Sequence, residues 1–279
     1  MIELAPDHKL GLPVACPVML GAGAIGYGES RHRELTLDGF GAVVIGPFTR
    51  RSRRGSQPPR MAETFGGFVR RVELQNRGVS AAVRKFAGLW PRLGCPVVAQ
   101  LGDSEPEEAA STAQRLSGVE GIEGFELVCS PAADEREISR LLEALLVESD
   151  LPVLAKLPLA RASALAPALI AAGAAGIVVG GPPMGAARNG DGGTVTGELF
   201  GPGVYPMMLA ALMEVKGLGL AGSLIACGGI HTREQAHHCL AAGADALQLD
   251  SLAWVEPAAA KALADAFAGR KPAGAGKDG

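Results

Sequence analysis

The sequence predicts a single (β/α)8 barrel of the α/β class. Eight short, almost continuously apolar segments alternate with segments of helical periodicity, as expected for parallel strands that are buried on both faces. The pattern Ala-Ala-Gly-Ala occurs at 171–174 and again at 241–244. Its glycine ends a helix, and its small residues let the next strand pack closely. Eight strands alternating with helices favour a closed barrel over an open sheet.

The predicted strands share short length and bounding turn residues. In order they are Pro17–Gly21, Ala42–Ile45, Pro96–Leu101, Gly124–Val128, Pro152–Leu157, Gly176–Gly180, Ser223–Ala226 and Ala246–Leu249. The first helix between them is predicted to begin after Ser104 as N-cap, with Glu107 at the third helical position. The other helices follow apolar periodicity: one along the face from Ile138 to Leu146, then Ala162–Ala172, Thr232–Ala242 and Pro257–Ala268.

We expect one domain over residues 1–269, with an N-terminal strand as a cap and a disordered tail at 270–279. Two long loops, at 50–78 and 181–203, interrupt the rhythm of strands and helices. Both follow the C-terminal end of a predicted strand, which is the end where barrel enzymes place their sites.

Composition excludes several classes of protein. With 26 basic and 29 acidic residues the net charge is −3, which argues against binding to nucleic acid or to a membrane surface. The five cysteines are odd in number and lack CxxC spacing, so we expect no metal or iron–sulfur site and reduced thiols in a cytoplasmic protein. The sequence shows no apolar run long enough to span a bilayer and no signal-peptide pattern at its start.

Glycines and polar residues follow the last two predicted strands. Gly228 and Gly229 come after the seventh strand, and Asp250 and Ser251 end the eighth. In many barrels these two loops hold a phosphate on backbone N–H groups, because glycine lets the backbone approach closely. The alternative is a tight turn without a ligand.

Lys156 lies near the end of the fifth strand in an otherwise apolar run. A buried ammonium group is costly without a partner, so we expect it to meet an anion, a ligand carbonyl or an electron-rich ring. A structural lysine and a Schiff-base lysine are the alternatives.

Two further motifs lie in the first long loop. Asn76, in the run Glu73–Gly78, offers donors and acceptors to a planar amide or imide, although an asparagine that stabilises the loop is the alternative. The basic run Arg50–Arg54 is either a solvated face or a clamp for an anionic substrate or partner.

Together these pieces resemble the dihydroorotate dehydrogenase family, in its class I form with flavin mononucleotide (FMN). The resemblance runs from Lys9 to Ala268. It rests most on Pro58–Thr64 (PPRMAET) and Leu74–Gly78 (LQNRG), with support from Lys156-Leu157 and Gly228-Gly229-Ile230. It implies a flavoprotein oxidoreductase of pyrimidine metabolism that acts on a CH–CH bond.

The resemblance also implies roles for particular residues. The catalytic group would be Ser130, or its neighbour Cys129 if the match slips by one residue, with Lys156 beside the flavin. Asn76 would touch the substrate. The cofactor-binding residues would be Gly21, Ala22 and Gly23 under the flavin ring, Lys156 at its polar edge, Gly228, Gly229, Asp250 and Ser251 around the phosphate, and Gln100.

The chain departs from the family pattern in four respects. Gly46 stands where the family has a lysine, and Gln100, Val128 and Gly180-Gly181-Pro182 stand where it has asparagines. The mobile loop after the catalytic residue is nearly absent. Asp250 replaces a small glycine, and a carboxylate repels a phosphate unless a cation such as Arg233 compensates. We therefore expect altered substrate choice and negligible turnover of dihydroorotate.

Two alternatives to a flavin enzyme stay open. The chain could be a non-catalytic barrel subunit that serves as a scaffold, or a flavin-free lyase that uses Lys156. Because the short loop leaves the barrel mouth open, we expect a homodimer or a second subunit that covers it.

Overall fold

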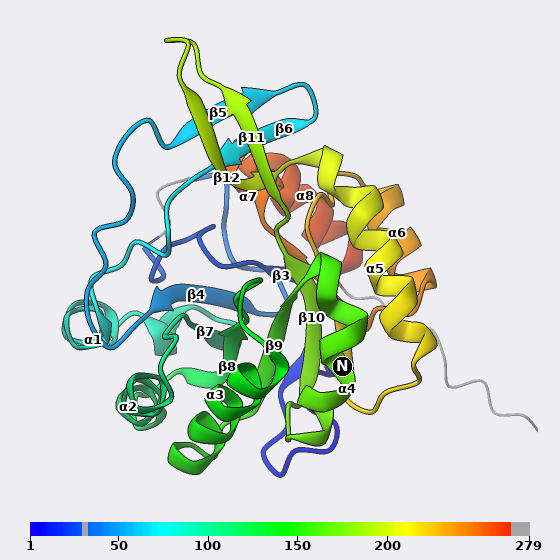
Figure 1. Cartoon of the computed structure of the whole chain (residues 1–279). Helices are drawn as coiled ribbons and strands as arrows, with labels where there is room; N and C mark the ends of the chain where they lie inside the picture. The colour runs from blue at the N-terminus through cyan, green and yellow to red at the C-terminus, as the bar shows by residue number, and fades with distance from the viewer. Residues whose placement is uncertain (30–32, 269–279) are drawn as a thin grey trace, which may run out of the picture.

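The computed structural model describes residues 1–29 and 33–268, and it confirms the (β/α)8 barrel (Figure 1). Eight parallel strands close on themselves, with the last pairing with the first. All eight predicted strands are present within a few residues of their predicted bounds. They are β3 (Val18–Leu20), β4 (Val43–Phe48), β7 (Val97–Leu101), β8 (Ile122–Val128), β9 (Val153–Pro158), β10 (Gly176–Gly181), β13 (Ser223–Cys227) and β14 (Ala246–Leu249).

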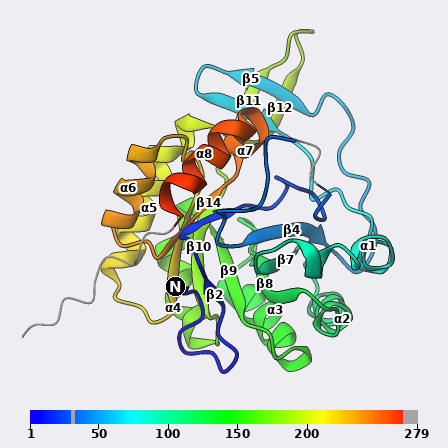
Figure 2. The same cartoon turned by 180° about the vertical axis from the view of Figure 1, so that it is seen from behind.

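Helices cover the outside of the barrel, with α5, α6 and α8 on one side and α1, α2 and α3 on the other (Figures 1 and 2). Their bounds are α1 (Val79–Phe86), α2 (Pro106–Ser117), α3 (Glu135–Glu148), α4 (Ala162–Ala171), α5 (Tyr205–Gly217), α6 (Arg233–Ala241), α7 (Ser251–Val255) and α8 (Pro257–Phe267). Among the described residues, no helix is long and apolar enough to cross a membrane.

Alternate residues of each strand serve two separate cores. Val43 and Ile45 of β4 belong to the large core under the helices, whereas Val44 belongs to the smaller core inside the barrel. Because successive side chains of a strand point to opposite faces, one apolar run supplies both cores. The hairpin of β1 (Ile2–Glu3) and β2 (Pro13–Val14) contributes Leu4 and Leu12 to the inner core.

Two predicted helix starts had different outcomes. Thr232 is the N-cap of α6 and forms a capping box with Gln235, in line with the predicted start at Thr232. The prediction of Ser104 as the N-cap of α2 is wrong, because the helix begins at Pro106 with Glu105 as its cap. Proline presets the helical φ at the first position, which moves the start of the helix.

The two stretches predicted as loops pair with each other. They contain β5 (Met61–Thr64) and β6 (Gly67–Arg70), and β11 (Met184–Arg188) and β12 (Thr194–Phe200), in an antiparallel sheet of order β11-β12-β6-β5. Both stretches leave the C-terminal ends of barrel strands, and the sheet stands over that end (Figure 1). The predicted tail at 270–279 lies outside the described residues.

Candidate functional site

Four buried polar side chains from four strands form one network inside the barrel. Glu126 of β8 accepts hydrogen bonds from Gln100 Nε2 at 2.7 Å and from Gln248 Nε2 at 2.6 Å. Lys156 Nζ of β9 donates to Gln248 Oε1 at 2.9 Å and lies 3.5 Å from Glu126 Oε1. Glu126 and Gln248 are fully buried, so this network satisfies groups that would otherwise be costly in the core.

The network holds Lys156 in its charged form. Burial by itself lowers the pKa of Lys156, but the surrounding Cys227, Glu126 and Asp250 side chains raise it above its ordinary value. An ammonium that keeps its proton is a poor nucleophile, so the geometry favours contact with an anion or an electron-rich ring over a Schiff base. Glu126 was missed in the sequence, although a carboxylate inside the apolar run Gly124–Val128 is a usable signal.

A second group of side chains is built around an arginine among aromatic rings. The guanidinium carbon of Arg70 lies 4.3 Å from the ring centroid of Trp254 and 4.5 Å from that of Phe200. Its Nη2 atom is 3.9 Å from Glu198 Oε2, and Phe68 stacks on Phe200. These residues were missed in the sequence because β6 and β12 bring Arg70 and Glu198 opposite each other only through their pairing.

The electrostatic influence of Asp250 connects these groups. Burial lowers the pKa of Arg70, whereas Glu198 and Asp250 oppose that change. Asp250 likewise acts to raise the pKa of Lys156. Arg70 and Lys156 are therefore the cations within the electrostatic influence of Asp250, whereas the predicted Arg233 lies exposed at the start of α6.

Asp250 is bonded to the residue that follows it. Its Oδ1 atom accepts hydrogen bonds from the backbone N–H of Ser251 and, at 3.0 Å, from the Ser251 hydroxyl. The Ser251 hydroxyl also lies 2.9 Å from His231 Nε2. Burial lowers the pKa of His231, which Asp250 and Glu256 oppose. Both donors of Ser251 are therefore engaged within the chain.

The glycines after β13 are explained by packing. A Cβ atom on Gly229 would lie 2.3 Å from Tyr205 N, and one on Gly228 would lie 3.4 Å from the Val204 side chain. Both glycines have positive φ and are buried. The close approach to the start of α5 therefore requires glycine at 229 whether or not a ligand binds.

The two candidate catalytic residues differ in exposure. Burial, with Glu126 adding to it, raises the pKa of the Cys129 thiol to about 12, and the side chain is buried. Ser130 is exposed, and its hydroxyl accepts a hydrogen bond from Ala132 N at 3.2 Å. Between the two, the geometry favours Ser130 as the group that can reach a substrate.

The short segment after Ser130 is held down. Arg161 Nη1 donates to the carbonyls of Pro131, at 3.2 Å, and of Ala133. Asp134 then starts α3 with a capping box. These bonds leave this segment little freedom to act as a lid over the barrel mouth.

Asn76 is bonded inside its own loop. Its Nδ2 atom donates to Thr49 Oγ1 at 2.7 Å and to Leu74 O at 2.8 Å, and its Oδ1 atom accepts from Gly78 N at 2.7 Å. The predicted substrate contact stays a prediction, and it would require some of these bonds to open.

Gly46 cannot be exchanged for a lysine in this backbone. Its φ is 120°, and a Cβ atom there would lie about 3 Å from both the Phe48 ring and the Gln100 carbonyl oxygen. After the neighbouring strand β3, Gly23 is exposed, and a Cβ atom on it would lie 3.3 Å from the Trp254 ring. Gly21 lies directly beside the backbone of Leu249.

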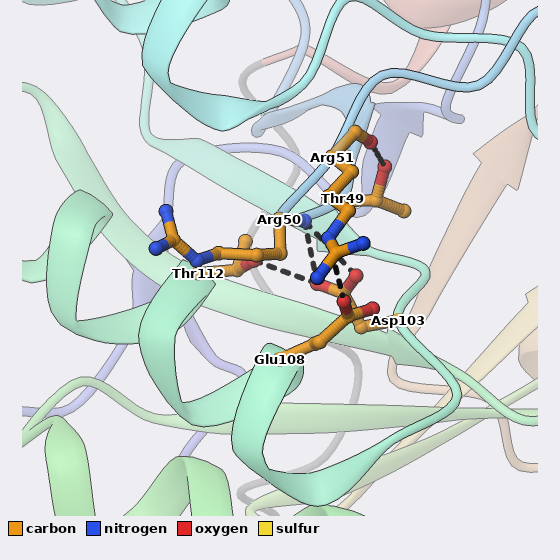
Figure 3. A network of polar contacts seen from close by, with 6 residues as sticks. All are labelled: Thr49, Arg50, Arg51, Asp103, Glu108 and Thr112. Atoms are coloured by element: carbon orange, nitrogen blue, oxygen red, sulfur yellow. Dashed lines mark hydrogen bonds and ion pairs between the residues drawn. The ribbon is translucent and has the colours of Figure 1, made fainter.

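The basic run is anchored from below by one buried carboxylate (Figure 3). Asp103 accepts from Arg50 N at 2.9 and 3.1 Å and from Thr112 Oγ1 at 2.6 Å. Figure 3 shows Arg51 turned toward Glu108, with Arg51 Nε 3.3 Å from Glu108 Oε1. The Arg50 side chain is turned away from the carboxylates of Asp103 and Glu108. Arg50 therefore offers its charge to solvent, whereas Arg51 has a surface partner.

Comparison with known proteins decides the family. The family model for dihydroorotate dehydrogenase matches residues 8–268. The chain belongs to the dihydroorotate dehydrogenase family.

Relatives of this family member have similar lengths. The catalytic subunit of dihydroorotate dehydrogenase B (NAD(+)) from Desulforudis audaxviator is 33% identical over 275 residues, covering 91% of this chain and 88% of the relative. Its counterpart from Geobacter sp. is 28% identical, and the match covers 93% of this chain and 91% of that relative. A crystal structure of the Eimeria tenella dihydroorotate dehydrogenase with ferulenol has a TM-score of 0.74 at 17% identity, covering 95% and 85%, and supports the fold.

The residues at the mouth suit the ring of FMN better than they suit its phosphate. At the mouth, the buried atoms Arg70 Nε and Trp254 Nε1 have no hydrogen-bond partner among the described residues. Two such donors, together with the Lys156 amine, suit an acceptor-rich planar ring. The resemblance would place the phosphate at Ser251, whose donors are already bonded to Asp250, so a phosphate there would have to displace the Asp250 carboxylate.

Proposed function

We propose that this dihydroorotate dehydrogenase family member is a flavin-dependent oxidoreductase. It would act on a CH–CH bond of a small polar substrate other than dihydroorotate. The observation that carries the proposal is the buried Lys156 side chain, held by Glu126 and Gln248, together with the unpartnered donors Arg70 Nε and Trp254 Nε1. When bound, the flavin would supply a hydride acceptor.

The residues of the chain have separate tasks in this reaction. Lys156, Arg70 and Trp254 bind and orient the ring by donating to its acceptors. Ser130 carries the substrate proton toward solvent, since its hydroxyl is exposed and can both accept and donate. Phe68 and Phe200 exclude water from one side of the mouth.

The proposed change of substrate rests on the lining of the mouth. Gly46 excludes a lysine, and the amide of Asn76 is engaged in its loop. Arg70 and Glu198 instead present charged groups. A site built to hydrogen-bond one substrate rejects analogues that leave its buried polar groups unpaired, so we expect negligible dihydroorotate oxidation.

Two measurements test the proposal. Visible absorbance of the protein as purified, and after incubation with riboflavin or FMN, should show bound flavin. Steady-state assays of that protein with dihydroorotate should then give a rate far below the roughly 1–1000 s⁻¹ that is usual for enzymes. A rate inside that range would contradict the change of substrate, and a folded protein that stays colourless would contradict the flavin enzyme.

A non-catalytic barrel subunit is the second candidate. The observation that favours it is the closed pair of Asp250 and Ser251, which fills the end of the mouth with the chain's own groups. A folded chain that binds neither riboflavin nor FMN would support this candidate.

We also propose that the chain works in the cytoplasm with a partner at the barrel mouth. The relatives above are named as catalytic subunits, which favours a second subunit, with a homodimer as the alternative. The exposed Arg50 would suit an acidic surface of such a partner. Sedimentation velocity distinguishes the two: a monomer that does not self-associate favours the second subunit.

A further inference from the structure

The strongest feature that the proposed function does not use is the closed pair of Asp250 and Ser251. Asp250 is buried, with 9% of its surface exposed. Its carboxylate takes both the N–H and the hydroxyl of Ser251. The family resemblance assigns those donors to a flavin phosphate, and here the chain supplies its own anion to them.

We propose that Asp250 makes the site select against the phosphate, so that it prefers the uncharged flavin riboflavin to FMN. This inference rests on the proposed function, because it concerns which flavin the same site accepts. It adds one statement about the ligand: the end of the flavin that lies away from the ring must be uncharged.

The neighbouring charges support this selection. Arg70, Lys156 and His231 all lie within the electrostatic influence of Asp250. However, Lys156 is paired with Glu126, and Arg70 lies next to Glu198. The positive charge near Asp250 is therefore already opposed by carboxylates, and a phosphate dianion would add charge of the same sign as Asp250.

The neighbouring backbone also supports the selection against a phosphate. Ser251 also contacts His231, and Gly229 packs on the start of α5. Asp250 is also the cap of α7, through the same bond to Ser251 N. Moving the carboxylate aside for a phosphate would therefore remove a helix cap, which opposes the exchange.

The test compares two ligands that carry the same ring. Riboflavin and FMN are titrated against the full chain by quenching of flavin fluorescence. The proteins are wild type, Asp250→Asn and Asp250→Gly, with Asp245→Asn as the matched control. Asp245 lies near the opposite end of β14, where it accepts from Leu224 N. Thermal melting of each protein confirms that it is folded.

We expect wild type to bind riboflavin more tightly than FMN. Asp250→Asn and Asp250→Gly should tighten FMN binding by about tenfold or more, since relief of ~1.4 kcal/mol of repulsion corresponds to that factor. The riboflavin affinity of these two variants should change by less than about threefold. Asp245→Asn should leave the ratio of the FMN and riboflavin dissociation constants unchanged. Raising the salt from about 0.05 to about 0.5 M should reduce the difference between the riboflavin and FMN affinities of wild type, because salt screens repulsion.

Other outcomes separate this inference from the proposed function. If wild type binds FMN more tightly than riboflavin, the selection against phosphate is overturned and the flavin enzyme stands. If wild type binds neither flavin but an Asp250 variant binds FMN, the selection stands and the proposed function fails for the natural chain. If no folded variant binds either flavin, both are overturned.

Discussion

The pairing of Lys156 with Glu126 shows how a single charged side chain constrains the inside of the barrel. The ammonium has Gln248 and Glu126 as partners, and Glu126 has two amide donors of its own. Removing one member of such a pair leaves an uncompensated charge in the core, whereas removing both can be nearly neutral. The pair is therefore best examined by changing each member alone and then both together.

We expect Glu126→Gln to lower the free energy of unfolding by about 3–5 kcal/mol, because Lys156 would stay buried without its counter-charge. Lys156→Met with Glu126→Gln should cost clearly less than the sum of the single changes. Urea denaturation measures each value. Lys9→Met breaks the exposed pair with Asp150 and should cost at most about 1 kcal/mol. Additive effects in the buried pair would show that the two groups do not interact.

Helix starts illustrate how local chemistry decides an element. Asp134 and Thr232 each accept a hydrogen bond from the third residue of their helix and complete a capping box. Glu105, at the start of α2, makes no such bond. The three helices occur in one fold and pack against the same barrel, so the caps can be compared directly.

Asp134→Ala and Thr232→Ala should each reduce the free energy of unfolding by about 0.5–2 kcal/mol, because a backbone donor loses its partner. Glu105→Ala should change it by less than about 0.5 kcal/mol. Denaturation in urea at neutral pH gives all three values. A loss at Glu105 as large as at the other two caps would contradict this account.

The folded molecule as a whole protects its thiols from ionisation. Burial raises the pKa of Cys16 and Cys95, the latter to about 11, and that of Cys129, Cys227 and Cys239 to about 12. The folded chain therefore holds these protons more tightly than the unfolded chain, whose thiols titrate near 9.0. Their contribution to stability is complete below that pH and is lost as the pH rises toward the folded values.

We expect the melting temperature to fall steadily as the pH rises above about 9, with each thiol adding up to about 1.4 kcal/mol per pH unit. Lys156 acts in the same direction at higher pH, because its pKa is also raised. Cys129→Ala should show a shallower decline than wild type in calorimetry across this range. Parallel declines for the two proteins would mean that Cys129 ionises as easily in the folded chain as in the unfolded one.

The eight barrel strands and the position of Lys156 could be predicted from the chain because their signals are local. Continuous apolar runs between turn residues indicate buried parallel strands, and a charged residue within such a run marks a place in the bore. Asp250 could be recognised in the same way, by its position at the end of β14. In contrast, Arg70 and Glu198 lie in segments with little apolar pattern, and only the pairing of β6 with β12 places them at the mouth. The partners of Asp250 and Asn76 were also decided by the tertiary structure, because a hydrogen bond depends on the distances between atoms that the fold brings together.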